Sequence, residues 1–301
     1  MPITRVSDAQ TFNFLTTRTG RFQTEILTLQ EQIASGRRVI SPDQDPLGAA
    51  EVVRANANLA ALAEQTRSGG FGSDALGAQD DALAEAGDIL VRAQEIATQQ
   101  ASSLLSPSER AAAQEEVHGL LQGLTAVANS EHAGRRLFGG LALDAPAPFA
   151  DPDSPGYTAA TAYTGSTFEF EVKVGNGSSD RVRISTQGDQ VFGTALQALE
   201  SLETALATNG NVAGTLDQLE QGRSILGAER ASVGARQAQL LDRTQTVSGL
   251  VEREEETRAK VQDSDLAVVV TQLAQTQVAL QATLAAAAKL ADVSLVNLLA
   301  I

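Results

Sequence analysis

The chain has 301 residues, 22 of them basic and 37 acidic, and its formal net charge is −15. A chain this acidic is poorly suited to bind nucleic acid or acidic lipid, so we expect neither partner. It has no cysteine and only two histidines, which excludes disulfides, thiolate metal sites and a three-histidine metal centre. No segment has the roughly 20 apolar residues that span a bilayer, and the first residues lack the pattern of a cleaved signal peptide.

The first 40 residues predict an amphipathic helix, the N-terminal arm (1–40). Apolar side chains recur there at alternating spacings of three and four, which places them on one face of a helix. The large ones are Phe12, Leu15, Phe22, Ile26, Leu29 and Ile33. Gly36 predicts the end of this helix, and a loop that contains Pro42 follows it.

Residues 41–140 predict the first part of a helical core domain. Proline suits the first position of a helix, so the second helix is expected to begin at Pro46. Its apolar positions form a seven-residue ladder: Leu62, Gly69, Leu76, Leu83, Leu90, Ala97 and Leu104. The ladder continues through the glycines of residues 69–72, which we interpret as a weak point or kink rather than a domain break. Residues 106–109, Ser-Pro-Ser-Glu, predict the capped start of a third helix that folds back on the second.

Residues 141–192 have a different composition and predict a small β-rich insertion. Asp, Pro, Gly, Ser and Thr are frequent in it. Residues 168–174 alternate apolar and polar side chains, as in a half-buried strand. A turn at residues 175–180 and a return strand from Val182 complete a predicted hairpin.

Helix is predicted again from about Gly193, and residues 193–262 form the second part of the core domain. A long helix after Gly210 carries another seven-residue ladder: Leu219, Leu226, Val233, Leu240 and Val247. Residues 263–265, Asp-Ser-Asp, predict the cap of a last helix, the C-terminal arm (263–301). Its apolar residues again alternate by three and four: Leu266, Val270, Leu273, Leu280, Leu284 and Leu298.

Several short patterns suggest chemistry, but a structural reading is stronger for each. Residues 70–75 match G-x-G-x-x-A, yet their flanks are helical, whereas a dinucleotide site needs a preceding strand. Asp43 and Asp45 lie beside prolines with no partner cluster, which favours helix capping over acid–base chemistry. His118 and His132 are expected to be isolated from any carboxylate cluster.

Three further patterns also have simpler explanations. We expect Arg135 and Arg136 to be solvated or at an interface, and residues 252–256 to form an acidic helix face. Residues 176–178 fit the N-glycosylation pattern, but a hairpin turn favours Asn-Gly there in any case. We therefore predict no catalytic residue, metal ligand or cofactor, and no enzyme.

The two terminal apolar stripes, at residues 12–33 and 266–298, fit either an ordinary core or an assembly surface. Both lie at chain ends, both are narrow, and neither has a globular partner nearby in the sequence. These features favour helices that pair with each other and with neighbouring copies. The candidate assembly interface is Phe12, Leu15, Phe22, Ile26, Leu29, Ile33, Leu266, Val270, Leu273, Leu280, Leu284 and Leu298.

Two segments closely resemble the signatures of the flagellin family. Residues 29–50, LQEQIASGRRVISPDQDPLGAA, resemble the segment after the family's first helix. Residues 263–267, with Leu273, Gln277 and residues 279–282, resemble its C-terminal signature. The resemblance implies a mainly α, elongated fold. In it, N- and C-terminal helices pair as a coiled coil beside a helical bundle with a small β-rich insertion.

Within this family, residues 137–140 (Leu-Phe-Gly-Gly) and 190–193 (Gln-Val-Phe-Gly) look more like the junction proteins between hook and filament than like flagellin. The resemblance thus implies a structural junction component of the bacterial flagellum, extracellular after type III export. Flagellin, the filament subunit itself, is the alternative. A cytoplasmic signalling coiled coil would need an input domain, and an adhesin would use a cleaved signal.

The same resemblance implies a set of partners. They are neighbouring copies of the chain, the adjacent hook-associated protein on the hook side, flagellin on the filament side, and a flagellar export chaperone that covers the C-terminal arm. Exposed apolar stripes that must not associate early give a physical reason for the chaperone.

Overall fold

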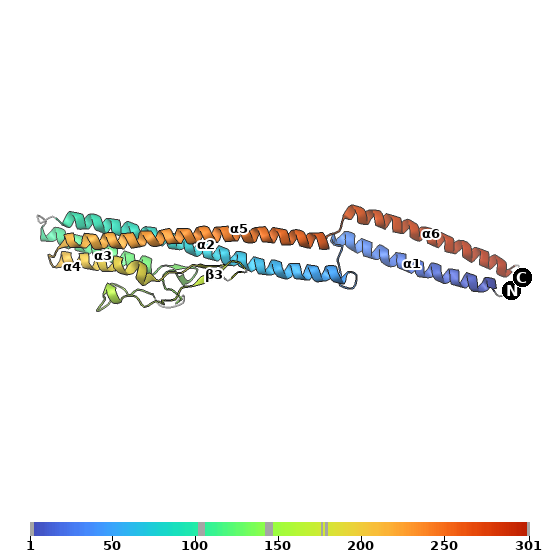
Figure 1. Ribbon diagram of the computed structural model, residues 1–301, viewed down its shortest axis with the longest axis horizontal. Helices are drawn as coiled ribbons and strands as arrows, with labels where there is room; N and C mark the ends of the chain where they lie inside the picture. The colour runs from blue at the N-terminus through green and yellow to red at the C-terminus, as the bar shows by residue number, and fades with distance from the viewer. Residues whose placement is uncertain (1–2, 102–105, 142–146, 176, 178–179, 300–301) are drawn as a thin grey trace. The chain divides into compact units, whose positions relative to one another are not determined.

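The computed structural model describes residues 3–101, 106–141, 147–175, 177 and 180–299, and most of them are helical (Figure 1). The helices of this part are α1 (Ile3–Ser35), α2 (Pro46–Gln100), α3 (Pro107–Ala128), α4 (Gly188–Ala207), α5 (Leu216–Gln262) and α6 (Leu266–Leu299). Short 3₁₀ helices, η1 (Ala159–Thr161) and η2 (Val212–Thr215), precede α4 and α5. The predicted fold class, mainly α with paired terminal helices and a small β-rich insertion, is confirmed.

The chain divides into two compact units, which we call the arm unit and the core unit. The arm unit consists of residues 1–60 and 252–301, and the core unit of residues 61–251. The helices α2 and α5 each contribute residues to both units. The five-part division predicted from the sequence remains a prediction.

Helix starts follow the capping signals in the sequence. Pro46 is the first residue of α2. Ahead of α3, the Glu109 amide donates to Ser106 Oγ at 3.3 Å and the Ser106 amide donates to Glu109 Oε2 at 2.7 Å, which forms the predicted capping box. Ahead of α6, Asp265 Oδ1 accepts from the Ala267 amide at 3.0 Å.

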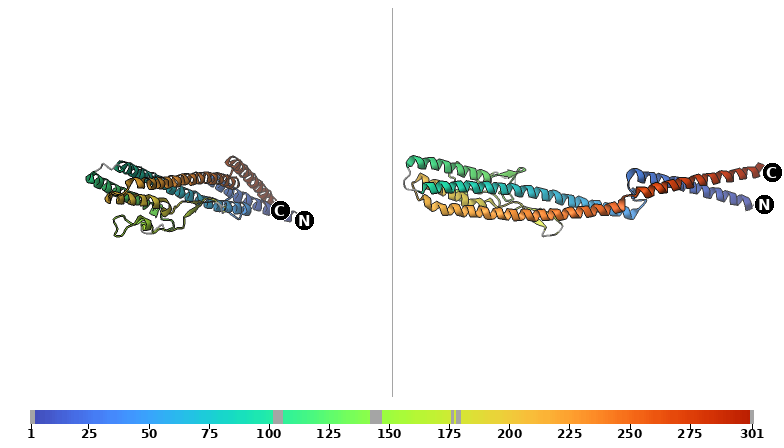
Figure 2. Two further views of the ribbon diagram at one scale, coloured as in Figure 1. Left: turned by 60° about the vertical axis from the view of Figure 1, so that its left-hand side comes forward. Right: turned by 90° about the horizontal axis from the view of Figure 1, so that it is seen from above.

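The core unit is built on the two predicted seven-residue ladders. The described α2 ladder residues are all buried, as are Leu219, Leu226, Val233, Leu240 and Val247 of α5. Leu104, the last predicted rung of the first ladder, lies outside the described residues. Within this unit α2 and α5 lie side by side (Figures 1 and 2), and Arg230 of α5 donates to Asp80 of α2 at 2.8 and 3.1 Å. Helix α3 packs on α4.

The glycines of residues 69–72 do not interrupt the helix, as predicted, and two of them, Gly69 and Gly72, lie where other elements approach closely. Helix α2 continues through them. A Cβ on Gly69 would lie 2.7 Å from the Thr244 hydroxyl of α5, and one on Gly72 would lie 2.9 Å from Leu240 and 3.0 Å from Val172 of the insertion. Glycine is required here because α5 and the insertion both approach the α2 backbone.

The insertion contains the predicted hairpin in a shorter form. Strands β3 (Glu171–Lys173) and β4 (Arg181–Arg183) are antiparallel, with Val172 opposite Val182 and both buried. Phe168 lies before β3 and is 70% exposed, so the prediction that it belongs to the strand is wrong. The pairing of β3 with β4 ends early because the Phe170 amide donates to the hydroxyl of Ser185, at 2.6 Å, and not to a strand carbonyl.

A second hairpin, β1 (Glu131–His132) with β2 (Arg135–Arg136), was not predicted. Its two-residue turn places Ala133 at φ 51° and Gly134 at φ 75°, both in the left-handed region. A turn of this kind matches the twist of the flanking strands, although alanine is an unusual residue at its first position.

Aromatic side chains connect the insertion to α4. Phe138 and Phe192 are fully buried and meet edge to face, with ring centroids 4.7 Å apart. Phe149 packs on the other side of Phe192 at 6.1 Å. The Gly188 amide donates to the Phe138 carbonyl at 3.0 Å. Gly188 is the first residue of α4, so this helix begins about one turn before the start predicted near Gly193. The two segments that suggested a junction protein, residues 137–140 and 190–193, therefore pack against each other.

Candidate assembly surface

Helices α1 and α6 lie side by side in the arm unit (Figures 1 and 2). On each helix the less exposed side chains recur at alternating spacings of four and three, which is the geometry of a coiled-coil seam. On α1 they include Leu15, Thr19, Phe22, Ile26, Leu29 and Ile33. On α6 they include Val269, Leu273, Thr276, Leu280, Thr283 and Ala287.

The seam of α6 uses only part of the stripe predicted from the sequence. Leu266, Val270 and Leu284 are 47%, 52% and 49% exposed and lie outside the seam. The apolar run at residues 266–270 allows two heptad registers, so spacing alone could not choose between them. The structure takes the register that buries the β-branched Val269 and Thr276 and half-buries Thr283, and these small side chains let the two helices approach closely.

Two threonines of the seam have hydroxyl groups that donate a hydrogen bond within their own helix. Thr19 donates to the Leu15 carbonyl at 2.9 Å, and Thr283 donates to the Ala279 carbonyl at 2.8 Å. A hydroxyl bonded to the carbonyl four residues earlier can face an apolar partner without the cost of an unpaired polar group.

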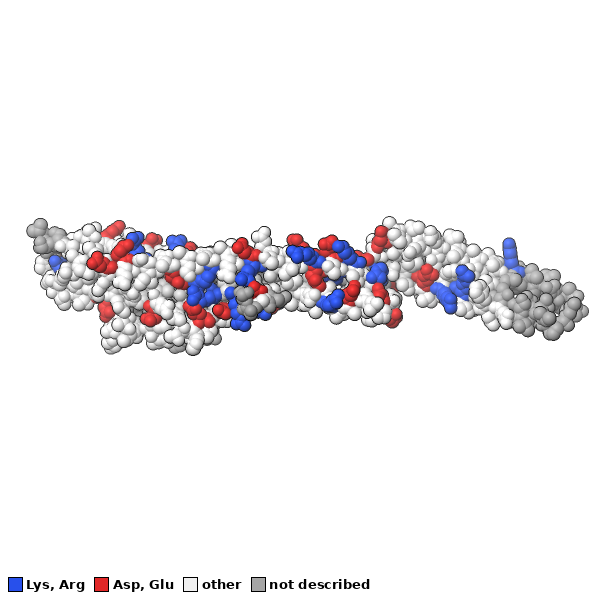
Figure 3. All heavy atoms as spheres, in the orientation of Figure 1, with Lys and Arg blue, Asp and Glu red and all other residues white. Residues whose placement is uncertain are grey.

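A second apolar row, which we call the outer row, remains exposed on α6. It consists of Leu266, Val270 and Leu284, which share one face of the helix by their spacing, whereas the exposed Val268 and Val278 lie on other faces. Residues 266–288 contain no charged side chain, and the side of α6 seen in Figure 3 is almost free of charge. An exposed apolar row of this length is typical of a surface that binds another protein. Phe14 and Leu27 are exposed on α1, whereas the side chains of Phe12 and Leu298 lie outside the described part.

The linkers at the base of the two arms pair with each other, and we call residues 36–39 and 261–264 the clasp. The Arg38 amide donates to the Gln262 carbonyl at 2.6 Å, and the Ser264 amide donates to the Gly36 carbonyl at 3.0 Å. Gly36 has φ 68°, a conformation that glycine adopts without strain. The signature at residues 29–50 thus includes half of the connection between the two arms.

Arg38 and Asp45 complete the clasp. The Arg38 guanidinium donates to Asp45 Oδ2 at 2.9 Å and to the Val261 carbonyl at 2.8 Å. Asp45 Oδ1 accepts from the Gly48 amide at 2.9 Å, and this bond, together with Arg38, lowers the pKa of Asp45. Asp45 therefore caps α2, as predicted. A hydrogen bond from Ser41 lowers the pKa of Asp43.

The glycine-rich pattern at residues 70–75 lies in a helix, as its flanks predicted. Residues 70–75 lie inside α2, with no strand before them. In the described part of the chain, no three His, Asp, Glu or Cys side chains are grouped to hold a metal ion, and no helix is long and apolar enough to cross a membrane. Asn176 and Ser178, the ends of the glycosylation pattern, lie outside the described residues.

His118 is not isolated from carboxylates, so that prediction is wrong. Its Nδ1 lies 3.0 Å from Glu203 of α4, and its Nε2 lies 2.9 Å from Asp153 of the insertion. These acids are 85 and 35 residues away in the chain, so no local pattern could reveal them. A neutral imidazole has one N–H, so donation to both carboxylates requires the imidazolium form. Burial opposes that charge, but the bond to Asp153 and the charge of Glu203 outweigh it and raise the pKa of His118.

We expect His118→Gln to destabilise the protein at pH 6 by about 1 kcal/mol or less, as for a partly exposed ion pair. Because the folded-state pKa is raised above 6.5, the stabilisation is complete below pH 6.5 and is lost as the pH rises through the folded value. Urea unfolding of both proteins between pH 5.5 and pH 9 measures this difference. His132→Gln is the control, since no carboxylate pairs with His132 within the described residues. A difference independent of pH would contradict the assignment.

Comparison with known proteins finds a family likeness in the N-terminal part of the chain. Residues 6–142 match the family model of the bacterial flagellin N-terminal helical region. The match covers almost all of α1, half of the clasp, α2, α3 and the β1–β2 hairpin, and it confirms the resemblance to the flagellin family.

Individual relatives are flagellar proteins of two kinds. Flagellar hook-associated protein 3 of Escherichia coli K12 is 24% identical over 196 residues, 65% of this chain and 59% of that protein. The chain thus spans about three-fifths of the length of this relative. The flagellar filament 30.7 kDa core protein of Treponema maltophilum is 23% identical over 258 residues, 85% of each chain.

A solved structure shares the fold. The crystal structure of flagellar hook-associated protein 3 from Legionella pneumophila has a TM-score of 0.61 at 14% identity, covering 70% of this chain and 98% of that one. At this identity the likeness shows a shared fold alone.

Proposed function

We propose that this chain is a structural, non-enzymatic component of the bacterial flagellum that joins the hook to the filament. The observation that carries the proposal is the exposed outer row on a helix whose other side is already paired with α1. In such a pair, one side of α6 packs on α1 within the same copy, and another side is free to pack on neighbouring copies. The likeness to hook-associated protein 3 supports the place of this assembly in the flagellum.

The seam and the outer row would act at different stages. The seam, with Leu29 and Leu280 among its members, holds α1 against α6 within one copy. The outer row, with Val270 and Leu284, then packs on neighbouring copies in a ring. The neighbours beyond that ring would be the adjacent hook-associated protein on the hook side and flagellin on the filament side.

Type III export would carry the chain to the cell exterior before assembly. Residues 266–288 carry no charge and are mostly apolar, so the unfolded chain would tend to aggregate through them. An export chaperone that covers this segment in the cytoplasm would prevent premature association.

Electron microscopy of cells that lack this protein tests the proposal directly. We expect hooks without filaments, with flagellin released into the medium. Filaments of normal number and length in those cells would overturn the proposal.

The similarity to a filament core protein over 85% of both chains keeps flagellin as the alternative. A flagellin adds many copies to its own kind, whereas a junction protein accepts different neighbours on its two sides and stops. We expect purified protein to add to isolated hook ends in a small, saturating number, counted by quantitative immunoblotting. Long filaments grown from this protein alone would favour flagellin.

A further inference from the structure

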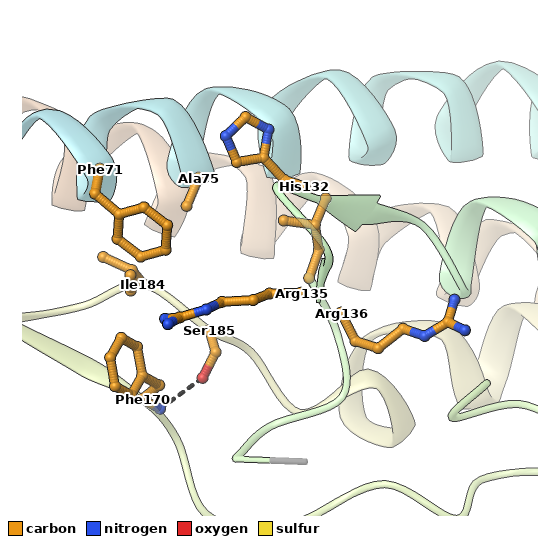
Figure 4. A pocket seen from close by; sticks show the side chains of 9 residues that line it. Phe71, Ala75, His132, Arg135, Arg136, Phe170, Ile184 and Ser185 are labelled. Atoms are coloured by element: carbon orange, nitrogen blue, oxygen red, sulfur yellow. Dashed lines mark hydrogen bonds between the residues drawn. The ribbon is translucent and has the colours of Figure 1, made fainter. Parts of the chain in front are cut away.

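We propose that Arg135 binds a carboxylate of a second copy of this chain when copies assemble, an inference that rests on the proposed function. Arg135 is an exposed residue of the β1–β2 hairpin. Its guanidinium lies between the rings of Phe71 and Phe170, with its central carbon 5.1 and 5.7 Å from the two ring centroids (Figure 4). A guanidinium within about 6 Å of a ring face is attracted to it.

The surroundings hold this guanidinium in one place. Phe71 stands on α2 and packs against the buried core, and the Phe170 amide donates to the Ser185 hydroxyl at 2.6 Å. On the strand itself, Arg135 pairs with His132 across a two-residue turn. An arginine fixed in this way loses little conformational entropy when it binds a partner.

The N–H donors of Arg135 have no acceptor in the part of the chain that the structure describes. Within the described residues, no carboxylate or carbonyl oxygen accepts a hydrogen bond from its guanidinium, whereas the other arginines of the two hairpins each have a carboxylate partner. These pairs are Arg136 with Glu131, Arg181 with Glu171, and Arg183 with Glu169. Stacking engages only the faces of the guanidinium, so the donors along its edge can bind a carboxylate through two parallel hydrogen bonds.

The charge of the chain indicates the partner. Each copy carries a net charge of −15, so copies repel one another unless cations lie opposite acids where they meet. A fixed, unpaired arginine beside two half-buried rings suits the carboxylate of such a copy. The cavity beside Arg135 measures about 20 Å³, which is room for about one water molecule. A partner must therefore reach the guanidinium from outside, as a side chain on a neighbouring surface does.

The test uses the full-length protein in cells that lack their own copy. We expect Arg135→Glu to be exported normally but incorporated into flagella about tenfold less than wild type, a loss typical of an interface arginine. Arg135→Met keeps an apolar stem between the rings and removes the donors, so it should show a similar loss with an unchanged melting temperature. Arg135→Lys should incorporate to an intermediate level. Arg181→Glu, with the same charge change on the neighbouring hairpin, should incorporate normally.

Second-site substitutions that suppress the defect of Arg135→Glu would identify the protein that supplies the carboxylate. We expect selection for restored swimming to yield substitutions of Asp or Glu by Lys or Arg elsewhere in this same chain. Normal incorporation of Arg135→Glu and Arg135→Met would overturn the proposal, as would suppressors confined to another flagellar protein. Absence of the wild-type chain from flagella would instead count against the proposed function.

Discussion

Replacement of Leu280 by aspartate is expected to abolish incorporation into the flagellum while leaving expression normal. Leu280 is half-buried in the seam of α6, and a carboxylate there loses apolar contact and places a charge between two helices. Such a change typically costs about 2–4 kcal/mol, which is a large share of the stability of a single helix pair. Incorporation is measured by immunoblotting of isolated flagella, and helix pairing by hydrogen exchange of α1 and α6.

Two further aspartates on the same helix separate the causes of this loss. Gln275→Asp introduces the same charge at an exposed polar position on the side of α6 opposite Leu266 and Leu284, and should be incorporated normally. Leu284→Asp lies on the outer row, so it should leave the hydrogen exchange of the arms unchanged and still reduce incorporation. If Leu280→Asp cells swim normally, the seam is not required for assembly. If Leu284→Asp cells do so, the outer row is not the surface between copies.

Sequence periodicity predicts the core helices well because only one heptad register fits each of them. The ladders from Leu62 to Ala97 and from Leu219 to Val247 repeat every seven residues over five and four heptads, so a single register accounts for each. Capping signals such as that at Ser106 are equally local, because the bonded groups lie three residues apart.

Periodicity fails where several registers fit or where the partner is distant in the chain. The apolar run at residues 266–270 allows two seams, and only the contact with α1 decides between them. The glycines at 69 and 72 resemble a helix defect until Thr244 is seen against Gly69 and Leu240 against Gly72. The environments of His118 and Arg135 depend on side chains contributed by other elements, which no single segment encodes.

Gly140→Ala is also expected to have a large effect, and it should destabilise the protein by about 3 kcal/mol or more. Gly140 has φ 65°, and a Cβ there would lie 2.2 Å from the Ser166 carbonyl oxygen and 2.6 Å from that of Phe168. Both oxygens belong to the backbone and cannot move aside as a flexible side chain could. Urea unfolding of the variant and the wild type measures the loss.

Gly134→Ala is the matched control for Gly140→Ala. Gly134 has φ 75°, but a Cβ at this position would meet no atom within 4 Å. The control therefore carries only the left-handed conformational cost, about 1 kcal/mol. Because Gly140 follows directly on Phe138 and Gly139, its substitution should also loosen the insertion from α4 and expose residues 147–175 to proteases. Equal losses of stability in the two variants would show that backbone conformation, rather than the close approach of Ser166, is why glycine is needed at position 140.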